Sequence, residues 1–456
     1  SVWSSGDALV GGAKRLVGLP ETAVRESKDR VRSALLNAGF DFPARRITLN
    51  LAPADLPKDG GRFDLAIALG ILAASGQLPG TALDGLECLG ELALSGAIRP
   101  VRGVLPAALA ARDARRVLVV PKENAEEASL ASGLTVFAVD HLLEIAGHLS
   151  GQAPLLPYQA RGLLRAPFPY PDLAEVQGQA AAKRALLVAA AGAHNLLLSG
   201  PPGTGKTLLA SRLPGLLPAL DEDEALEVAA IHSVASHVPL RHWPQRPYRQ
   251  PHHSASAPAL VGGGSRPQPG EITLAHQGVL FLDELPEFER KVLEVLREPL
   301  ESGEIVIARA NDRVRFPARF QLVAAMNPCP CGYLGDPSGR CRCTPEQVQR
   351  YRGKLSGPLL DRIDLHVSVL RESTSLQPGH GETATAEISE RVGAARQRQL
   401  ARQGCANAHL DLQAMHRNCA LAEADRRWLE AAGERLELSL RALHRILKVA
   451  RTLADL

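Results

Sequence analysis

The stretch that decides the fold is residues 195–207, which read Asn195-Leu-Leu-Leu-Ser199-Gly200-Pro-Pro-Gly-Thr-Gly-Lys206-Thr207. Residues 195–199 form a short apolar run typical of a buried strand, and a Leu-rich segment suited to a helix follows. A glycine-rich loop between a strand and a helix is the setting of a phosphate-binding loop, because glycines let backbone N–H groups converge on phosphate oxygens. The following helix N-terminus adds a favourable dipole. The alternative, a chance glycine-rich turn, is disfavoured by the strand and helix on either side.

We therefore predict that this loop binds ATP, with Lys206 reaching the β- and γ-phosphates and the Thr207 hydroxyl binding Mg²⁺. The predicted ATP-binding residues are Gly200, Pro201, Pro202, Gly203, Thr204, Gly205, Lys206 and Thr207. Strands and helices alternate around this loop, so the predicted fold class is α/β, with a parallel-sheet P-loop core.

Two later strand ends carry polar side chains that fit the same site. A buried-strand run ends in Asp283 and Glu284. Asp283 beside Thr207 would hold Mg²⁺, and Glu284 would polarise the attacking water as a general base. The alternative is a solvated acidic turn. The third strand ends at Asn327, which would orient water or contact the γ-phosphate, because ligands bind at the carboxyl ends of parallel strands.

Composition places the chain among soluble globular proteins. Apolar residues make up 45% and charged residues 22% of the 456 residues, and the net charge is +3. This balance excludes disordered and polybasic proteins but leaves room for a local basic surface. The longest apolar runs are too short to span a bilayer, and the first residues do not resemble a signal peptide. Seven cysteines, an odd number, favour a reducing compartment over a disulfide framework. We expect a cytoplasmic protein without a membrane partner.

Changes in composition divide the chain into blocks. Residues 1–150 mix strand-like runs with Ala/Leu-rich helical stretches, which predicts an α/β domain. A Pro-rich linker at 151–171 precedes the P-loop core at 172–370. A polar linker at 371–385 leads to residues 386–456, which we predict to form an all-helical lid.

Taken together, these motifs make the sequence resemble the AAA+ ATPases of the magnesium-chelatase-like clade, and within that clade the bacterial ComM/YifB family. Besides the P-loop and the strand ends, five strings carry the resemblance. They are Arg249-Gln-Pro-His-His-Ser254, Pro269-Gly-Glu-Ile-Thr-Leu-Ala-His276, Leu285-Pro-Glu-Phe288, Leu359-Leu-Asp-Arg362-Ile-Asp364 and Leu438-Ser-Leu-Arg441-Ala-Leu-His-Arg445-Ile-Leu-Lys-Val-Ala-Arg451. The resemblance implies a hexameric ring that hydrolyses ATP and acts as a DNA helicase in branch migration during natural transformation and recombination.

The resemblance also implies roles for single residues. Glu284 looks like the hydrolytic base, and Asn327 looks like sensor 1. In the lid, Arg441 resembles sensor 2, with Arg445 a less favoured substitute.

Arg362 resembles the arginine finger that is given to the neighbouring subunit's ATP. A cation near developing phosphoryl charge is a strong catalytic device. A finger that acts in trans requires a closed head-to-tail ring. The alternative for Arg362 is an exposed ion pair within the chain, with Asp361 or Asp364.

The N-terminal block is similar to the proteolytic domain of Lon protease, a ribosomal protein S5-like fold. The similarity is carried by Pro57-Lys-Asp-Gly-Gly-Arg62-Phe-Asp64 and Gly90-Glu-Leu-Ala-Leu-Ser-Gly96. That fold uses a Ser–Lys dyad, but here Arg62 stands in place of the serine and Leu105 in place of the lysine. Neither side chain can carry covalent acyl chemistry, so the resemblance implies an inactive domain.

Four cysteines at 329–343 predict a structural zinc site. Cys329, Cys331, Cys341 and Cys343 form two C-x-C pairs separated by nine residues. Four soft thiolates suit tetrahedral Zn²⁺. Free cysteines in a turn, or a redox pair, are the alternatives.

Two basic segments are candidates for contact with DNA. The candidate residues are Arg246, Arg249, Arg309 and Arg313, of which the last two flank the tip of a predicted hairpin. Such arginines in a ring pore would bind phosphate without regard to sequence. The alternative is a solvated basic face. The adjacent His252 and His253 are interpreted as a hydrogen-bonded loop pair.

We therefore expect an ATP- and Mg²⁺-dependent motor whose partners are copies of itself and single-stranded or branched DNA. The alternative is a protein-remodelling or chelatase-like motor that acts on a partner protein. A nucleotide-dependent scaffold with little turnover is disfavoured because both Glu284 and Arg362 are present.

Overall fold

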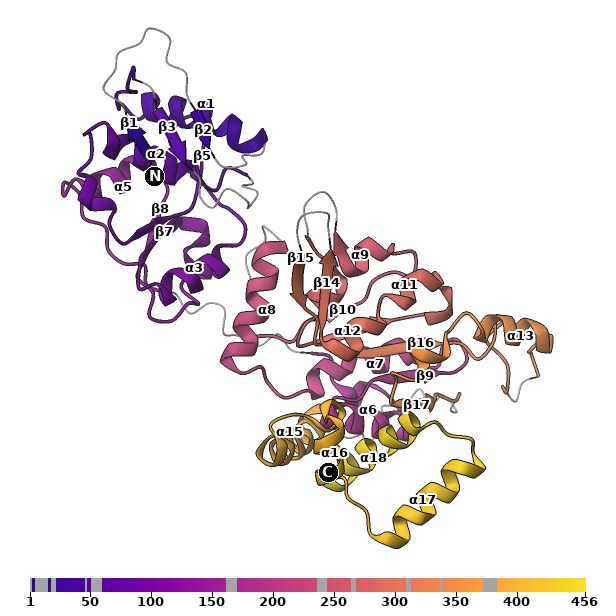
Figure 1. Cartoon of the computed structure of the whole chain (residues 1–456). Coiled ribbons are helices and arrows are strands. Elements are labelled where there is room, and N and C mark those ends of the chain that lie inside the picture. The colour runs from indigo at the N-terminus through magenta and orange to yellow at the C-terminus, as the bar shows by residue number, and fades with distance from the viewer. Residues whose placement is uncertain are drawn as a thin grey trace. The chain divides into compact units, whose positions relative to one another are not determined.

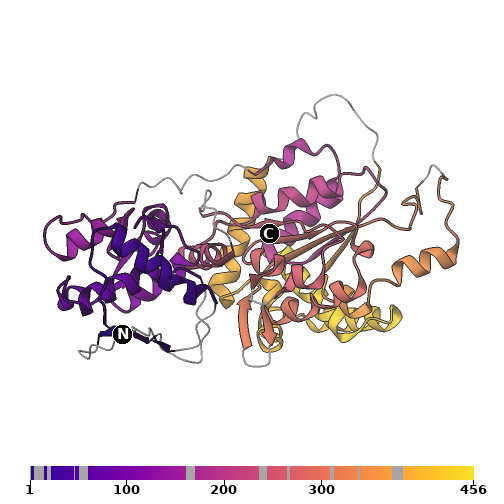
Figure 2. The ribbon, with the colours of Figure 1, turned by 90° about the horizontal axis from the view of Figure 1, so that it is seen from above.

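The computed structural model describes residues 2–4, 15–17, 22–45, 47–50, 60–160, 170–235, 244–263, 268–308, 313–336, 339–371 and 384–456 (Figures 1 and 2). The chain divides into two compact units. One comprises Ser1–Ala166 with Ala229–Trp243, and the other Pro167–Val228 with Pro244–Leu456.

The first unit contains two small sheets with helices packed on them. One sheet has the order β1-β3-β2 and the other, which is parallel, has the order β4-β7-β8. The strands are β1 (Val2–Ser4), β2 (Arg15–Val17), β3 (Ile47–Asn50), β4 (Leu86–Cys88), β7 (Val117–Pro121) and β8 (Val136–Val139), with a hairpin of β5 (Glu91–Leu92) and β6 (Ile98–Arg99). The helices are α1 (Thr22–Asn37), α2 (Asp64–Ala74), α3 (Val104–Asp113), α4 (Ala125–Ala128) and α5 (Leu142–Leu149), with short 3₁₀ turns η1 (Gly80–Leu83) and η2 (Lys122–Asn124).

Helix α2 lies at the centre of this unit, because most of its residues are buried. Its buried first residue, Asp64, is held by Arg30, whose Nε lies 2.9 Å from Oδ2. Burial raises the pKa of Asp64 to about 6, against the hydrogen bond from Arg30. Arg62 donates to the carbonyl of Gly103, and Leu105 is buried in α3. The likeness to Lon protease stays a prediction.

The second unit is built on a five-stranded sheet with the order β10-β13-β16-β9-β17, and every pairing in it is parallel. This confirms the predicted α/β class and parallel core. The strands are β9 (Leu196–Ser199), β10 (Tyr248–Arg249), β13 (Val279–Leu282), β16 (Gln321–Met326) and β17 (Leu365–Ser368). Two hairpins lie outside the sheet, β11 (Gly262–Gly263) with β12 (Gln268–Pro269) and β14 (Glu304–Ala308) with β15 (Arg313–Pro317).

Helices cover both faces of this sheet, so its central strands are buried on both sides (Figure 2). One face packs against α6 (Ala180–Gly192), α7 (Lys206–Leu216) and α15 (Thr385–Gln403), and the other against α9 (Ala257–Val261), α10 (Glu271–Leu274), α11 (Arg290–Glu294), α12 (Arg297–Ser302) and α14 (Gly357–Leu360). The remaining elements are η4 (Leu173–Glu175), η5 (Leu285–Glu287) and α13 (Pro345–Arg352), together with the first half of α8 (Glu222–Ala235), whose residues from Ala229 on belong to the first unit.

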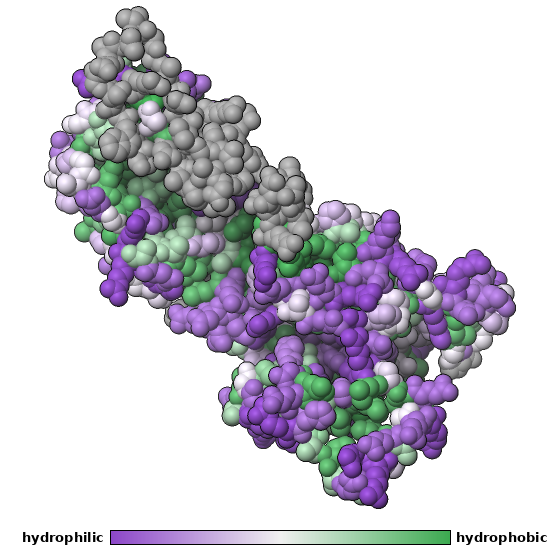
Figure 3. All heavy atoms as spheres, viewed as in Figure 1, coloured by the Kyte–Doolittle hydropathy of each residue, from purple (hydrophilic) through white to green (hydrophobic). Residues whose placement is uncertain are grey.

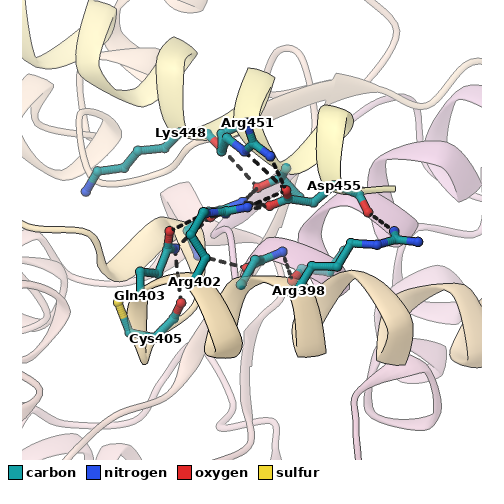
Figure 4. A network of polar contacts seen from close by, with 11 residues as sticks. Arg398, Arg402, Gln403, Cys405, Lys448, Arg451 and Asp455 are labelled. Carbon is teal, nitrogen blue, oxygen red and sulfur yellow. Dashed lines mark hydrogen bonds and ion pairs between the residues drawn. The ribbon is translucent and has the colours of Figure 1, made fainter. Parts of the chain in front are cut away.

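The C-terminal part is helical, as predicted. It comprises α15, η6 (Asn407–His409), α16 (Leu412–Asn418), α17 (Glu423–Arg435) and α18 (Leu440–Asp455). Asp455 at the end of α18 is buried and joins this part together, because its carboxylate accepts hydrogen bonds from Arg402, Asn407 and Arg451 (Figure 4). Burial would raise its pKa, but these hydrogen bonds outweigh burial and lower the pKa to about 2.

Candidate active site

The phosphate-binding loop leaves the carboxyl end of β9 and enters α7. Gly200 has no room for a side chain, since a Cβ there would lie 2.1 Å from the carbonyl oxygen of Val369. Gly203 and Gly205 have φ values of +77° and +83°, in the left-handed region that favours glycine. These backbone requirements explain the glycine spacing and leave the α7 N-terminus open toward a phosphate.

Lys206, the first residue of α7, is held inside the loop. Its Nζ donates to the carbonyls of Gly200 at 2.7 Å and Pro201 at 2.8 Å, and to Asn327 Oδ1 at 3.2 Å. Burial lowers the pKa of Lys206, while Asp283 and Glu284 act in the opposite direction. The structure thus brings together the ends of β9 and β16, as the sequence predicted.

Asp283, which follows β13, faces Thr207. The Thr207 hydroxyl donates to Asp283 Oδ2 at 2.6 Å. Mg²⁺ prefers oxygen ligands, and this hydroxyl–carboxylate pair beside the P-loop therefore fits it. The two residues could hold Mg²⁺ together with phosphate oxygens.

Glu284 lies next to this pair and has an unusual backbone. Its φ is +52°, and its amide donates to Asp283 Oδ1 at 2.9 Å. Its carboxylate is half exposed and contacts the imidazole of His253, with Nδ1 3.1 Å from Oε2. The sequence indicated the His252–His253 pair but not this contact, which only the packing of β10 against β13 creates.

The four cysteines converge in the loop after β16. Their sulfur atoms all lie within 4.8 Å of one another, and three of the separations are 3.4, 3.7 and 3.8 Å. Tetrahedral Zn–S bonds of about 2.3 Å place sulfurs about 3.8 Å apart, so the set fits zinc. Backbone N–H groups of Tyr333 and Arg342 lower the pKa of Cys331 to about 6, whereas the pKa values of Cys341 and Cys343 are raised, because their backbone hydrogen bonds are outweighed by desolvation and the neighbouring thiols.

This cysteine loop also touches the nucleotide site. Gly332 has φ +84°, and a Cβ there would lie 2.7 Å from Pro202 Cδ of the P-loop. Asn327, two residues before Cys329, bonds Lys206. The cysteine loop therefore lies against the P-loop and follows directly on the strand end that carries Asn327.

Arg362 and Arg441 converge on one carboxylate. Glu301 Oε1 lies 2.5 Å from Arg362 Nη2 and 3.2 Å from Arg441 Nη2. Arg362 is therefore paired within the chain, but with Glu301 and not with Asp361 or Asp364. Arg445 instead bonds the carbonyls of Leu360 and Ile363 and pairs with Asp361.

These arginines lie at the opposite end of the sheet from the P-loop. The amides of Asp364 and Leu365, just after Arg362, donate to the carbonyl of Asn195, which precedes β9. The P-loop follows β9, and four residues of strand span about 13 Å. A pocket of about 740 Å³ opens here, lined by Glu301, Arg362, Arg441, Arg445 and Lys448 among others, and no P-loop residue lines it.

Of the predicted DNA contacts, the structure describes the side chains of Arg246 and Arg249, and both are bonded within the chain. Arg246 is mostly buried, with 15% of its side chain exposed, and donates to the carbonyls of Pro218 and Gln277 and to Glu224, which favours a structural role. Arg249 forms a two-point pair with Glu271, each bond 2.7 Å. Arg309 and the side chain of Arg313 lie outside the described residues.

No helix in the described ranges has the length and apolarity to cross a membrane.

Comparison with known proteins gives three family matches along the chain. Residues 172–376 match magnesium chelatase subunit ChlI, residues 10–124 match the ChlI subunit of Mg-chelatase, and residues 382–456 match the ChlI C-terminal family. The chain is 55% identical to competence protein ComM of Haemophilus influenzae, over 97% of this chain and 88% of that protein. It is 52% identical to YifB of Salmonella typhimurium, over 97% of this chain and 87% of that protein. It is 27% identical to the magnesium-chelatase 38 kDa subunit of Cereibacter sphaeroides, over 45% of this chain and 60% of that protein.

Proposed function

The chain belongs to the magnesium-chelatase-like ComM/YifB family of AAA+ proteins, and from this premise we propose that it is a ring-forming ATPase that couples ATP hydrolysis to movement along DNA. The observation that carries the ATPase proposal is the meeting of Lys206, Thr207, Asp283, Glu284 and Asn327 at the carboxyl ends of adjacent parallel strands.

Each of these residues has a distinct task in hydrolysis. On binding ATP, Lys206 exchanges its carbonyl partners for phosphate oxygens, which suit a buried ammonium better. Thr207 and Asp283 would hold Mg²⁺, which would supply positive charge beside the phosphates. Glu284 accepts a proton from the attacking water, and Asn327 orients that water or the γ-phosphate.

The position of the arginines supports a ring. Arg362 and Arg441 lie at the opposite end of the strands from their own P-loop, so neither side chain reaches the nucleotide bound by its own subunit. In a head-to-tail ring this end of the sheet would face the next subunit, where both arginines would meet the neighbour's ATP. Apolar patches interrupt the hydrophilic surface of the C-terminal helices (Figure 3), and Leu440 beside Arg441 is exposed. Such a patch supports a subunit contact.

The cysteine cluster is proposed to hold structural zinc. Four protein ligands leave no open position for a substrate, so the metal would brace Asn327 and the P-loop and take no part in the chemistry.

The choice of DNA as substrate rests on two observations. The relative from H. influenzae is named a competence protein, and this name favours DNA as the substrate. In this chain the strand β15 exposes Arg315, with 75% of the side chain accessible, next to the predicted hairpin tip. The alternative, a motor acting on a partner protein, is supported by the match to the magnesium-chelatase 38 kDa subunit.

The test is the ATPase rate with and without single-stranded and forked DNA at low and moderate salt. We expect several-fold stimulation that weakens with salt, because phosphate contacts release counterions. Arg315→Ala should reduce the stimulation and keep the basal rate, whereas Arg426→Ala, an exposed arginine on α17, should change neither. Glu284→Gln should bind ATP but hydrolyse it only at a slow residual rate. Basal turnover without DNA stimulation would move the proposal to a protein-directed motor.

A further inference from the structure

We propose that His253 is a positioning residue that holds the general base Glu284 by one carboxylate oxygen and leaves the other oxygen free to accept the proton of the attacking water. This inference rests on the proposed ATPase function of the same site. His253 lies in the string 249–254 and contacts neither the P-loop residues nor Asp283 in the described contacts, so it has no part in holding the nucleotide.

The sheet brings His253 to Glu284. Strand β10 pairs in parallel with β13, with Tyr248 opposite Val279 and Arg249 opposite Leu280. The residues that follow two neighbouring parallel strands lie at the same end of the sheet. The segment after β10 therefore passes the end of β13, where His253 Nδ1 lies 3.1 Å from Glu284 Oε2.

The His253 ring is fixed by its neighbours. It packs against His252 in a tilted arrangement with the ring centres 4.1 Å apart, and its centre lies 6.4 Å from that of buried Phe288, edge to face. His252 is itself held, because its Nδ1 lies 2.8 Å from Ser254 Oγ and accepts from the Ser254 amide. An imidazole held on two sides can act as a fixed hydrogen-bond donor.

Glu284 needs such a partner. Its backbone is defined by a positive φ, by the bond from its amide to Asp283, and by its carbonyl, which accepts from the Glu287 amide at 2.7 Å. A side-chain-bearing residue keeps a left-handed conformation only where its surroundings determine it. The carboxylate is half exposed, and among the described residues the contact that restrains it is the one with His253.

The chemistry of the pair follows from its geometry. A carboxylate only accepts hydrogen bonds, so the 3.1 Å approach of Nδ1 to Oε2 becomes a hydrogen bond when Nδ1 carries the hydrogen. Oε1 remains for the water. In hydrolysis a water proton passes to Oε1, the water oxygen bonds the γ-phosphorus, and the bond to the β–γ bridging oxygen breaks with its electron pair leaving on ADP. Rotation of an unrestrained carboxylate would reduce the fraction of time that Oε1 faces the water.

The test compares steady-state ATPase and equilibrium ATP binding in the full chain. His253→Ala should lower kcat about tenfold or more and leave KM and ATP binding within about twofold, because the contact acts on the base and not on the nucleotide. His253→Asn should recover part of kcat, since its amide nitrogen stands near the place of Nδ1. His253→Gln, whose amide reaches the place of Nε2, should recover less. His252→Ala, which removes one of the two rings that hold His253 but keeps the contact to Glu284, should lower kcat less than His253→Ala does.

A double variant separates positioning from a general structural role. In single-turnover hydrolysis, His253→Ala combined with Glu284→Gln should be no slower than Glu284→Gln alone, because His253 acts through that carboxylate. Additive losses, or full kcat in His253→Ala, would overturn the inference while leaving the ATPase proposal intact. A wild-type protein without ATPase activity, or a fully active Glu284→Gln variant, would overturn both.

Discussion

The most quantitative prediction concerns Asp455, which ties α18 to α15 (Figure 4). The variant Asp455→Asn preserves the shape of the side chain and removes its charge. In the folded protein the pKa of Asp455 is about 2, against an ordinary value of 3.8. A lowered pKa means that the folded state favours the charged form, so the stabilisation is present above the ordinary pKa and is lost as the pH falls toward 2.

The size of the effect follows from this shift. A difference of nearly two pKa units corresponds to about 2.5 kcal/mol at neutral pH. The partners Arg402 and Arg451 remain partly exposed to solvent, which screens the interaction, so we expect a loss of about 2 kcal/mol. That loss corresponds to roughly 30-fold more frequent opening of α18.

Native-state hydrogen exchange of the α18 amides at neutral pH measures this opening. Asp425→Asn, which removes an exposed carboxylate on α17, is the matched control and should change exchange by less than about 0.5 kcal/mol. Equal protection of α18 in the wild type and in Asp455→Asn would refute the reasoning. Because α18 carries Arg441 and Arg445, the same variant should also weaken ATP hydrolysis more than ATP binding.

Three further predictions address the nucleotide site, the ring and the metal. Lys206→Ala should abolish ATP binding, measured with a fluorescent ATP analogue, and wild-type affinity would remove Lys206 from the site. Arg362→Ala should bind ATP without hydrolysing it, and mixing it with Lys206→Ala subunits should restore some turnover. A mixture as inactive as either variant alone would argue against a finger acting in trans. The purified protein should carry about one zinc per chain, and less than about half an equivalent would contradict the site. Cys331→Ser should release zinc and weaken ATP binding, because the cysteine loop touches Pro202.

Several features of the site could be predicted because they are local. The glycines of the P-loop report backbone conformations that other residues adopt poorly, and Gly203 and Gly205 have the expected left-handed φ values. The apolar runs before Asp283 and Asn327 required buried strands, and parallel pairing then placed their ends beside Lys206.

Other features could not be predicted because they depend on which surfaces meet. Arg246 lies in a basic, aromatic-rich segment that indicated DNA contact, but three carbonyls and Glu224 surround its guanidinium. Charge in a sequence does not distinguish a solvated arginine from one that satisfies buried carbonyls.

The sequence by itself thus determined the P-loop, the parallel α/β core and the convergence of four cysteines, since these follow from local backbone preference, apolar periodicity and ligand spacing. Only the tertiary structure decided that Glu301 takes both Arg362 and Arg441, and that His253 meets Glu284. Glu301 and Arg441 are 140 residues apart in the sequence. Such pairs form because whole helices and strands pack together and bring distant residues into contact. A local sequence pattern contains no information about those contacts.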